Sequence, residues 1–277
     1  MNTTISIKEL VTNANDIQAK EPKFYCKDWL PIPKNTLSMI SAPGGTGKSF
    51  LSIQLAIRII AENPNHRVLL WLSEDPLFYT KDRIDKIFNR ILPNLLDKKE
   101  EILKNIDIIG AENETIYFNE LSLQDLTKIG DELVVNYNVV VLDPLIGFYT
   151  GDENSNSEAR KFMNILNRIA QERLLSIVLI HHHNKNGEGA RTRGASAFVD
   201  AVRLLYTVNT IKINEKEIHP TKRLIKVEKD NWGVRQLLNK SELEREILPY
   251  QVKEIVIEPN KNKNDSDSAD KELEIWQ

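Results

Sequence analysis

The sequence predicts an α/β fold in which helices flank a mostly parallel central sheet, and three observations indicate it. Short apolar runs alternate with longer segments of helical periodicity along the 277 residues, which is the order expected of βαβ units. Two of these runs, Val139–Leu142 and Ile177–Ile180, are apolar throughout and mostly β-branched, as in central strands covered on both faces. A glycine-rich loop, residues 42–49, joins the first strand pattern to the first long helix pattern.

The elements can be placed in order by their periodicity. Strands are expected at residues 36–40, 68–72, 106–109, 139–142, 177–180, 202–208 and 223–227. Helices are expected at residues 48–61, 81–92, 123–136 and 159–173. We predict an N-terminal arm over residues 1–34, a core over 35–240 and a C-terminal extension over 241–277. Within that extension, residues 259–271 contain a single apolar residue, Ala269, which is typical of a flexible tail.

Composition narrows the class of protein. Hydrophobic residues make up 41% and charged residues 28% of the chain, with a net charge of -3, which excludes disordered and collagen-like chains. No apolar run reaches the length of a membrane span, and the first residues lack the basic end and apolar stretch of a signal peptide. A single cysteine, Cys26, favours a reducing compartment, and the cytoplasm is the simplest expectation. The near-neutral charge argues against a wholly basic surface but allows nucleic acid binding by local positive loops.

Glycines gather where a ligand is expected. Eight of the 11 glycines lie in three short stretches, at residues 44–47, 147–151 and 187–194. Glycine is needed where the backbone turns with positive φ or approaches a ligand closely. The three stretches are therefore candidates for functional loops, although ordinary turns explain the second and third equally well.

The first stretch fits the phosphate-loop pattern G-x-x-x-x-G-K-[ST], with alanine in the first glycine position. Its backbone N–H groups and the start of the next helix can surround a phosphate. Lys48 would reach the β- and γ-phosphate oxygens, and the Ser49 hydroxyl would bind Mg²⁺. The pattern thus predicts a nucleoside triphosphate, taken as ATP, with Mg²⁺. The candidate phosphate-binding residues are Gly44, Gly45, Thr46, Gly47, Lys48 and Ser49.

Two strand patterns end in carboxylates. Asp143 follows Val139–Leu142 and is the expected Mg²⁺ ligand of a phosphate-loop enzyme, although it could merely end the strand. Glu74 follows the strand after the loop helix and is the candidate base for the attacking water. The alternative is that the acidic residues here cap the next helix. We assign that role to Asp75, as the N-cap with Pro76 at the first helical position, and assign Glu74 to the chemistry.

Three consecutive histidines end another strand pattern. Adjacent strand residues point to opposite faces, and no Cys or Glu stands at ligand spacing, so a metal site is disfavoured. We choose His182 as a sensor of the γ-phosphate, whereas His181 and His183 would be packing or solvent residues. The loop over residues 184–194 that follows carries Lys185, Arg191 and Arg193. These cations would suit a phosphodiester backbone, and a solvated basic loop is the alternative.

Taken together, these motifs resemble the RecA-type P-loop NTPases, in particular the RepA-like hexameric replicative helicases of plasmids and phages. The matching stretches are SAPGGTGKS, VLLWLSEDP, VVVLDPLIGF, SIVLIHHH, RTRGASAFVDAVR and KVEKDNWG. The resemblance implies a RecA-like core and a homo-hexameric ring with ATP at each subunit interface. It also implies that Lys48 and Ser49 bind phosphate and Mg²⁺, Asp143 binds Mg²⁺, Glu74 is the base, His182 the sensor, and Arg203 an arginine finger for the neighbouring site. From the residues alone, Arg203 could equally be a surface residue.

The expected function is therefore that of an ATP-dependent DNA helicase or translocase acting on single-stranded DNA, with a primase or another replication protein as a further partner and no membrane. The alternative is a RecA-fold regulatory ATPase switch, in signalling or phage defence, without unwinding activity. We expect no extra N-terminal domain of the DnaB type, because the first strand pattern begins at residue 36, and the family pattern does not explain the polar tail.

Overall fold

The computed structural model describes residues 11–182, 196–213 and 216–250. Its main feature is an eight-stranded sheet with the strand order β12-β11-β8-β3-β7-β6-β4-β5. The strands from β8 to β5 pair in parallel, whereas β11 pairs antiparallel with β8 and β12. The predicted α/β class with a mostly parallel sheet is confirmed.

The strands of this sheet are short and mostly buried. They are β3 (Leu37–Ala42), β4 (Val68–Leu72), β5 (Ile106–Ile109), β6 (Val139–Asp143), β7 (Ser176–His182), β8 (Leu204–Thr210), β11 (Lys222–Asp230) and β12 (Glu242–Glu246). All residues of β3, β4 and β6 are buried, which explains why their sequences are apolar runs rather than alternating patterns.

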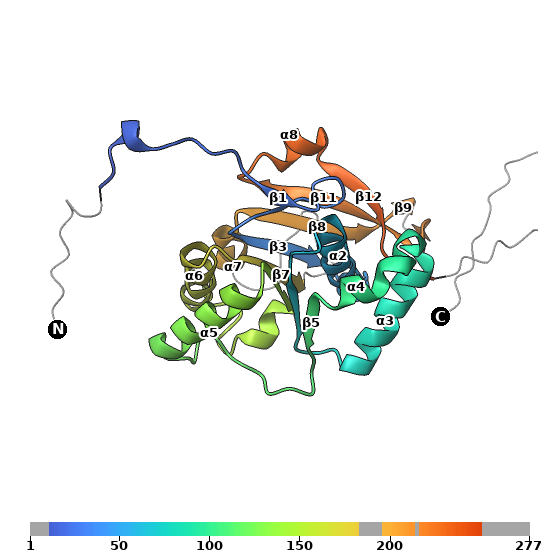
Figure 1. The fold of residues 1–277 in the computed structure, drawn as a ribbon, viewed down its shortest axis with the longest axis horizontal. Coiled ribbons are helices and arrows are strands. Elements are labelled where there is room, and N and C mark those ends of the chain that lie inside the picture. Colours follow the sequence, from blue (N-terminus) through green and yellow to red (C-terminus); the bar gives the residue numbers. More distant parts are fainter. Residues whose placement is uncertain (1–10, 183–195, 214–215, 251–277) are drawn as a thin grey trace, which may run out of the picture.

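Helices cover both faces of the sheet (Figure 1). On one face lie α2 (Lys48–Glu62), α3 (Leu77–Arg90) and α4 (Lys99–Leu103), and on the other lie α5 (Leu123–Asn136), α6 (Asn156–Glu172) and α7 (Ser196–Ala201). Successive residues of a strand point into the hydrophobic cores on opposite faces of the sheet. In β4, Leu70 packs in the core on the α2 side, whereas Leu69 and Trp71 pack in the core on the α6 side. The alternation follows from the two-residue repeat of a strand.

The remaining elements are short. They are η1 (Ala14–Asp16), β1 (Phe24–Tyr25), β2 (Ile32–Pro33), η2 (Pro93–Lys98), η3 (Leu145–Phe148), β9 (Lys212–Ile213), β10 (Lys216–Glu217) and α8 (Val234–Leu238). Strands β1 and β2 form one antiparallel pair and β9 and β10 another. In the described part of the chain, no helix is long and apolar enough to cross a membrane.

The folded core extends at both ends beyond residues 35–240, the range predicted from the sequence. The β1–β2 pair lies before residue 35, yet Tyr25, Leu30 and Ile32 are buried in the α2-side core. Beyond residue 240, β12 completes the sheet, and Ile247 is fully buried. Within the described part of the predicted arm, residues 11–23 are exposed and extend away from the body (Figure 1). The tail over residues 259–271 lies outside the described residues.

Candidate nucleotide-binding site

Four neighbouring strands end side by side at one edge of the sheet. Strands β3, β7, β6 and β4 are consecutive in the sheet order, with Ala42 opposite His182 and Leu72 opposite Asp143. Because parallel strands present their carboxyl ends at the same edge, the residues that follow them meet there. A cavity of about 270 Å³ opens at this edge. It is lined by Gly45, Gly47, Lys48, Ser49, Phe50, Glu74, Asp75, Arg83, Asp143, Pro144, His182, Leu248 and Tyr250.

The loop between β3 and α2 has the backbone of a phosphate cradle. Gly45 and Gly47 have φ angles of +77° and +97°, a region that side chains disfavour. Gly47 is also the residue that precedes the first turn of α2, so the N-terminal N–H groups of α2 open into the cavity. The Thr46 side chain closes the turn by donating to the Pro43 carbonyl at 2.8 Å. The glycines of the motif are thus needed for conformation.

Lys48 is folded along the loop. It is 7% exposed, and its Nζ donates to the carbonyls of Ala42 at 3.2 Å and Pro43 at 3.1 Å. Burial lowers the pKa of Lys48, whereas the nearby carboxylates of Asp143 and Glu74 oppose that shift. The ammonium group is therefore held at the cavity by backbone acceptors, from which it can turn to phosphate oxygens.

Asp143 is a buried carboxylate beside the loop. Its Oδ2 accepts a hydrogen bond from Ser52 Oγ of α2 at 3.1 Å. Burial raises the pKa of Asp143 to about 6, a shift that Asp75 adds to and that Ser52 and Lys48 oppose. A nearby cation would stabilise the negative charge of such a buried carboxylate. With the Ser49 hydroxyl, Asp143 provides oxygen donors of the kind that Mg²⁺ prefers. Among the described residues there is no group of three or more His, Cys, Asp or Glu side chains that could hold a metal ion.

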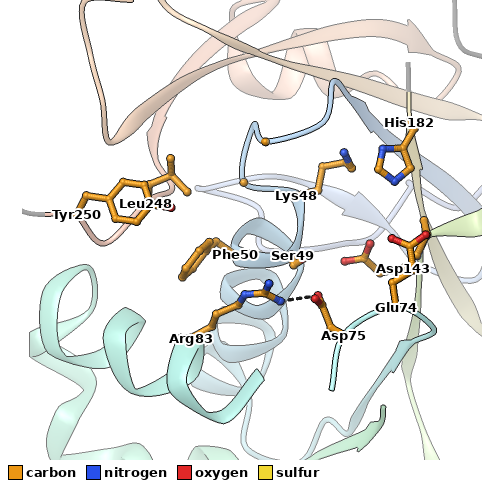
Figure 2. A pocket seen from close by; sticks show the side chains of 13 residues that line it. Lys48, Ser49, Phe50, Glu74, Asp75, Arg83, Asp143, His182, Leu248 and Tyr250 are labelled. Atoms are coloured by element: carbon orange, nitrogen blue, oxygen red, sulfur yellow. Dashed lines mark hydrogen bonds and ion pairs between the residues drawn. The ribbon is translucent and has the colours of Figure 1, made fainter. Parts of the chain in front are cut away.

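Glu74 and His182 face the same space from two other strand ends. Figure 2 shows Glu74 beside Asp143, with His182 next to Lys48. Glu74 is exposed to the cavity, whereas His182 is half-buried. Its neighbour His181 is 3% exposed and packs on Phe198 with ring centroids 5.7 Å apart, as expected for a packing residue on the opposite face. His183 lies outside the described residues.

The prediction that Asp75 caps α3 is wrong. The capping position is Pro76, the helix begins at Leu77, and no side chain caps it locally. Instead, the Leu77 N–H donates to the Glu112 carboxylate at 2.9 Å, while Asp75 forms an ion pair with Arg83 (Figure 2). The pairing uses a residue two turns along the helix, which a local capping rule does not anticipate.

One wall of the cavity comes from the far end of the described chain. The Leu248 side chain packs against Gly47, where an added Cβ would lie 2.7 Å from Leu248 Cδ2. Tyr250 contacts Phe50 edge-on with centroids 6.4 Å apart, and the Arg83 guanidinium lies over the Phe50 ring at 5.7 Å. Leu248 and Tyr250 belong to no motif, and only their position after the last strand could have pointed to them.

Arg203 lies away from this cavity. It immediately precedes β8, whose first residue, Leu204, is opposite Ser38 near the start of β3. Arg203 therefore lies at the opposite edge of the sheet, exposed in a polar hollow lined also by Arg160, Arg168 and Asp200. Lys185, Arg191 and Arg193 lie outside the described residues. The structure thus brings together at the cavity every described candidate on the phosphate side except Gly44 and Thr46, which line a second hollow behind the loop.

One protein family matches most of the chain. The model of the family described as "AAA domain" matches residues 2–188. The match includes the phosphate loop, Glu74, Asp143 and His182, so it covers the strand ends that build the cavity.

Proposed function

Because the chain belongs to the AAA domain family, whose members are RecA-like P-loop ATPases, we propose that this P-loop ATPase is a DNA helicase or translocase. In this proposal six copies form a ring on single-stranded DNA and hydrolyse ATP at their interfaces. The observation that supports the proposal is the separation of Lys48 and Arg203, which lie at opposite edges of the sheet in one protomer, so that they could act on one ATP only between two copies.

ATP fits the cavity in a defined direction. The phosphates lie on the loop N–H groups, with Lys48 on the β- and γ-phosphate oxygens. The base lies at the other end, in the slot where Phe50 and Arg83 face Leu248 and Tyr250, because flat aromatic and guanidinium groups stack on bases of any sequence. Mg²⁺ bound by Ser49 and Asp143 would neutralise charge on the phosphates.

Hydrolysis requires a base in line with the γ-phosphate. Glu74 is the carboxylate at this position, exposed to the cavity beside the buried Asp143. It takes a proton from water as the water oxygen bonds to the γ-phosphorus, and the bond from that phosphorus to the bridging oxygen of ADP breaks. His182, at the end of the neighbouring β7, detects whether the γ-phosphate is present.

A neighbouring copy completes the site. The cations that line the cavity in the described residues are Lys48 and Arg83, and Arg83 is paired with Asp75. A guanidinium that stabilises transition-state charge is worth about 10³–10⁵ in rate. Arg203 supplies this group to the next protomer, because its exposed position at the opposite edge suits action between copies. Hydrolysis then depends on assembly.

Single-stranded DNA would pass through the ring, bound by the loop that contains Lys185, Arg191 and Arg193, and a primase or another replication protein would be a further partner. The direct test measures the ATPase rate with and without single-stranded DNA, together with the native mass. We expect stimulation by DNA and a mass of six chains. A monomeric mass, or an ATPase rate that DNA does not change, would overturn the helicase proposal. A multimer whose ATPase rate does not respond to DNA would favour the regulatory switch.

A pair of variants tests whether the measured ATPase activity belongs to this protein or to a contaminating ATPase. Lys48→Ala removes the ammonium group that lies on the phosphate loop and is expected to abolish ATPase activity with and without DNA. Lys34→Ala is the control, since Lys34 lies over the Tyr25 ring, on the β1–β2 pair and away from the cavity, and should retain the rate.

A further inference from the structure

A buried arginine lies behind the phosphate loop, on the side away from the nucleotide cavity. Arg223 of β11 is 3% exposed, and its Nε donates to the carbonyl oxygen of Thr46 at 2.9 Å. Together with Gly44, Gly45 and Thr46 it lines the second hollow behind the loop. The arginine therefore holds the backbone of the loop at the residue before Gly47.

The orientation of one peptide group makes this contact important. The Thr46 carbonyl and the Gly47 N–H belong to the same peptide unit, and in a planar trans peptide they point in opposite directions. With the carbonyl directed to Arg223, the Gly47 N–H is directed away from it. Gly47 lines the nucleotide cavity, whereas Arg223 and Thr46 line the hollow behind it. The bond to Arg223 thus directs a loop N–H towards the phosphate position.

The loop cannot hold this orientation by sterics alone. Gly47 has a φ of +97°, and glycine populates such angles about as readily as negative ones. A rotation of the Thr46–Gly47 peptide would therefore cost little if nothing held its carbonyl. The Leu248 side chain packs on the Cα of Gly47, but it forms no hydrogen bond that would select one peptide orientation.

Arg223 itself is held by further acceptors within the chain. Its Nη1 faces the carbonyls of His219, Pro220 and Lys222 at 2.7–3.2 Å and the Glu217 carboxylate at 2.9 Å. A planar guanidinium with several donors in use loses little further freedom when it binds one more acceptor. The segment after β10 thus forms a rigid support for the loop.

We propose that Arg223 is a positioning residue for the β-phosphate: it orients the Thr46–Gly47 peptide so that the Gly47 N–H binds that phosphate. The inference rests on the proposed function, because it requires the loop to bind a nucleotide. It concerns binding of phosphate and not of the base, which lies at the other end of the cavity. Arg223 touches no reacting atom in this arrangement.

The test compares ligands that differ in their phosphates. ADP, AMP and adenosine are titrated against the full-length wild type, Arg223→Met and Arg223→Lys by calorimetry or ligand NMR. We expect Arg223→Met to weaken ADP binding about 10- to 100-fold, as for loss of a charge-assisted hydrogen bond, with adenosine affinity unchanged. Arg223→Lys keeps the charge and one donor, and should lose less ADP affinity than Arg223→Met.

Arg245 provides the matched control. It lies directly opposite Arg223 on β12 and also donates its Nε to a backbone carbonyl, that of Trp29, at 2.8 Å. Arg245→Met removes a guanidinium that is half-buried, whereas Arg223 is buried, and that lies away from the loop. We expect it to lower the melting temperature and to leave ADP and adenosine affinity unchanged.

The outcomes separate this inference from the proposed function. A wild type that does not bind ADP would overturn both. A wild type that binds ADP, with Arg223 variants that bind it equally well or that lose ADP and adenosine affinity in the same ratio, would overturn the role of Arg223 alone. If neither variant folds, the backbone amide NMR signal of Gly47 in the wild type decides: it should shift with ADP but not with adenosine, and an unchanged signal would overturn the proposal.

Discussion

Lys48 and Arg203 lie at opposite edges of one sheet. Lys48 follows the carboxyl end of β3, and Arg203 precedes β8, which begins opposite Ser38 of β3. The strand between Ser38 and Ala42 alone spans roughly 13 Å. Within one protomer the Arg203 side chain is therefore held away from a triphosphate on the Lys48 side, and any joint action of the two residues needs two copies of the chain.

The first prediction uses this separation. Lys48→Ala and Arg203→Ala proteins should each lose nearly all ATP turnover, the second by about 10³-fold or more. Mixed after dissociation and reassembly, they should regain activity, because about one quarter of the interfaces in an equal random mixture would combine an intact Lys48 with an intact Arg203. Steady-state phosphate release against the mixing ratio measures the recovery.

The control for this mixture pairs Lys48→Ala with Glu74→Gln. Both residues line the same cavity, so every interface in that mixture carries a defect on the same side and no recovery is expected. Absence of recovery with Arg203→Ala at all ratios would argue against Arg203 as a finger.

The second prediction concerns the base. Glu74→Gln should bind ATP as the wild type does and lose turnover by about 10²- to 10⁴-fold, since an amide cannot accept the proton of the attacking water. Fluorescent-nucleotide titration and single-turnover hydrolysis measure the two quantities. Glu112→Gln is the matched control, because its carboxylate caps α3 at Leu77 outside the cavity. Near-normal turnover in Glu74→Gln would show that another group is the base.

The third prediction concerns the buried carboxylate of Asp143. Burial raises its pKa from 3.8 to about 6, so the folded protein binds this proton more tightly than the unfolded chain. Ionised Asp143 therefore lowers the free energy of unfolding. This destabilisation reaches its full size above pH 6 and disappears as the pH falls below about 4. It corresponds to at most about 3 kcal/mol.

Asp143→Asn should therefore raise the melting temperature of the protein without nucleotide or Mg²⁺ at pH 8, and the gain should shrink towards pH 4. The variant retains a group that can accept from Ser52. Thermal unfolding in the presence of a chelator across this pH range measures the effect, and ATPase assays should show that the more stable variant is inactive. A variant less stable than the wild type at pH 8 would contradict the prediction.

The sequence predicted the parts of the fold that depend on local pattern. The expected bounds of β4, β5 and α5 agree with the structure, because apolar runs and helical periodicity are local properties of the chain. The placement of Glu74 and Asp143 together at the ends of their strands was also predictable, since parallel strands place their carboxyl ends at one edge.

Residues that reach the site from distant parts of the chain were not predictable. Arg223 contacts Thr46 across 177 positions, and nothing distinguishes it in sequence from the other arginines. Tyr250 lies in a segment assigned to the C-terminal extension, yet it lines the cavity. In both cases the contact depends on how the β11–β12 edge packs on the loop, which periodicity does not report.

The last prediction tests the wall that Tyr250 forms. Tyr250 is 51% exposed and meets Phe50 edge-on, so its ring can stack on a base. Tyr250→Ala should weaken ATP, ADP and adenosine binding by the same factor, about 5- to 150-fold, because stacking contributes about 1–3 kcal/mol per base. Tyr250→Phe should bind normally. Tyr79→Ala is the control, an equally exposed tyrosine at 55% that contacts Phe78 instead. Loss of ADP affinity with unchanged adenosine affinity would place Tyr250 at the phosphates and contradict the assigned direction of the nucleotide.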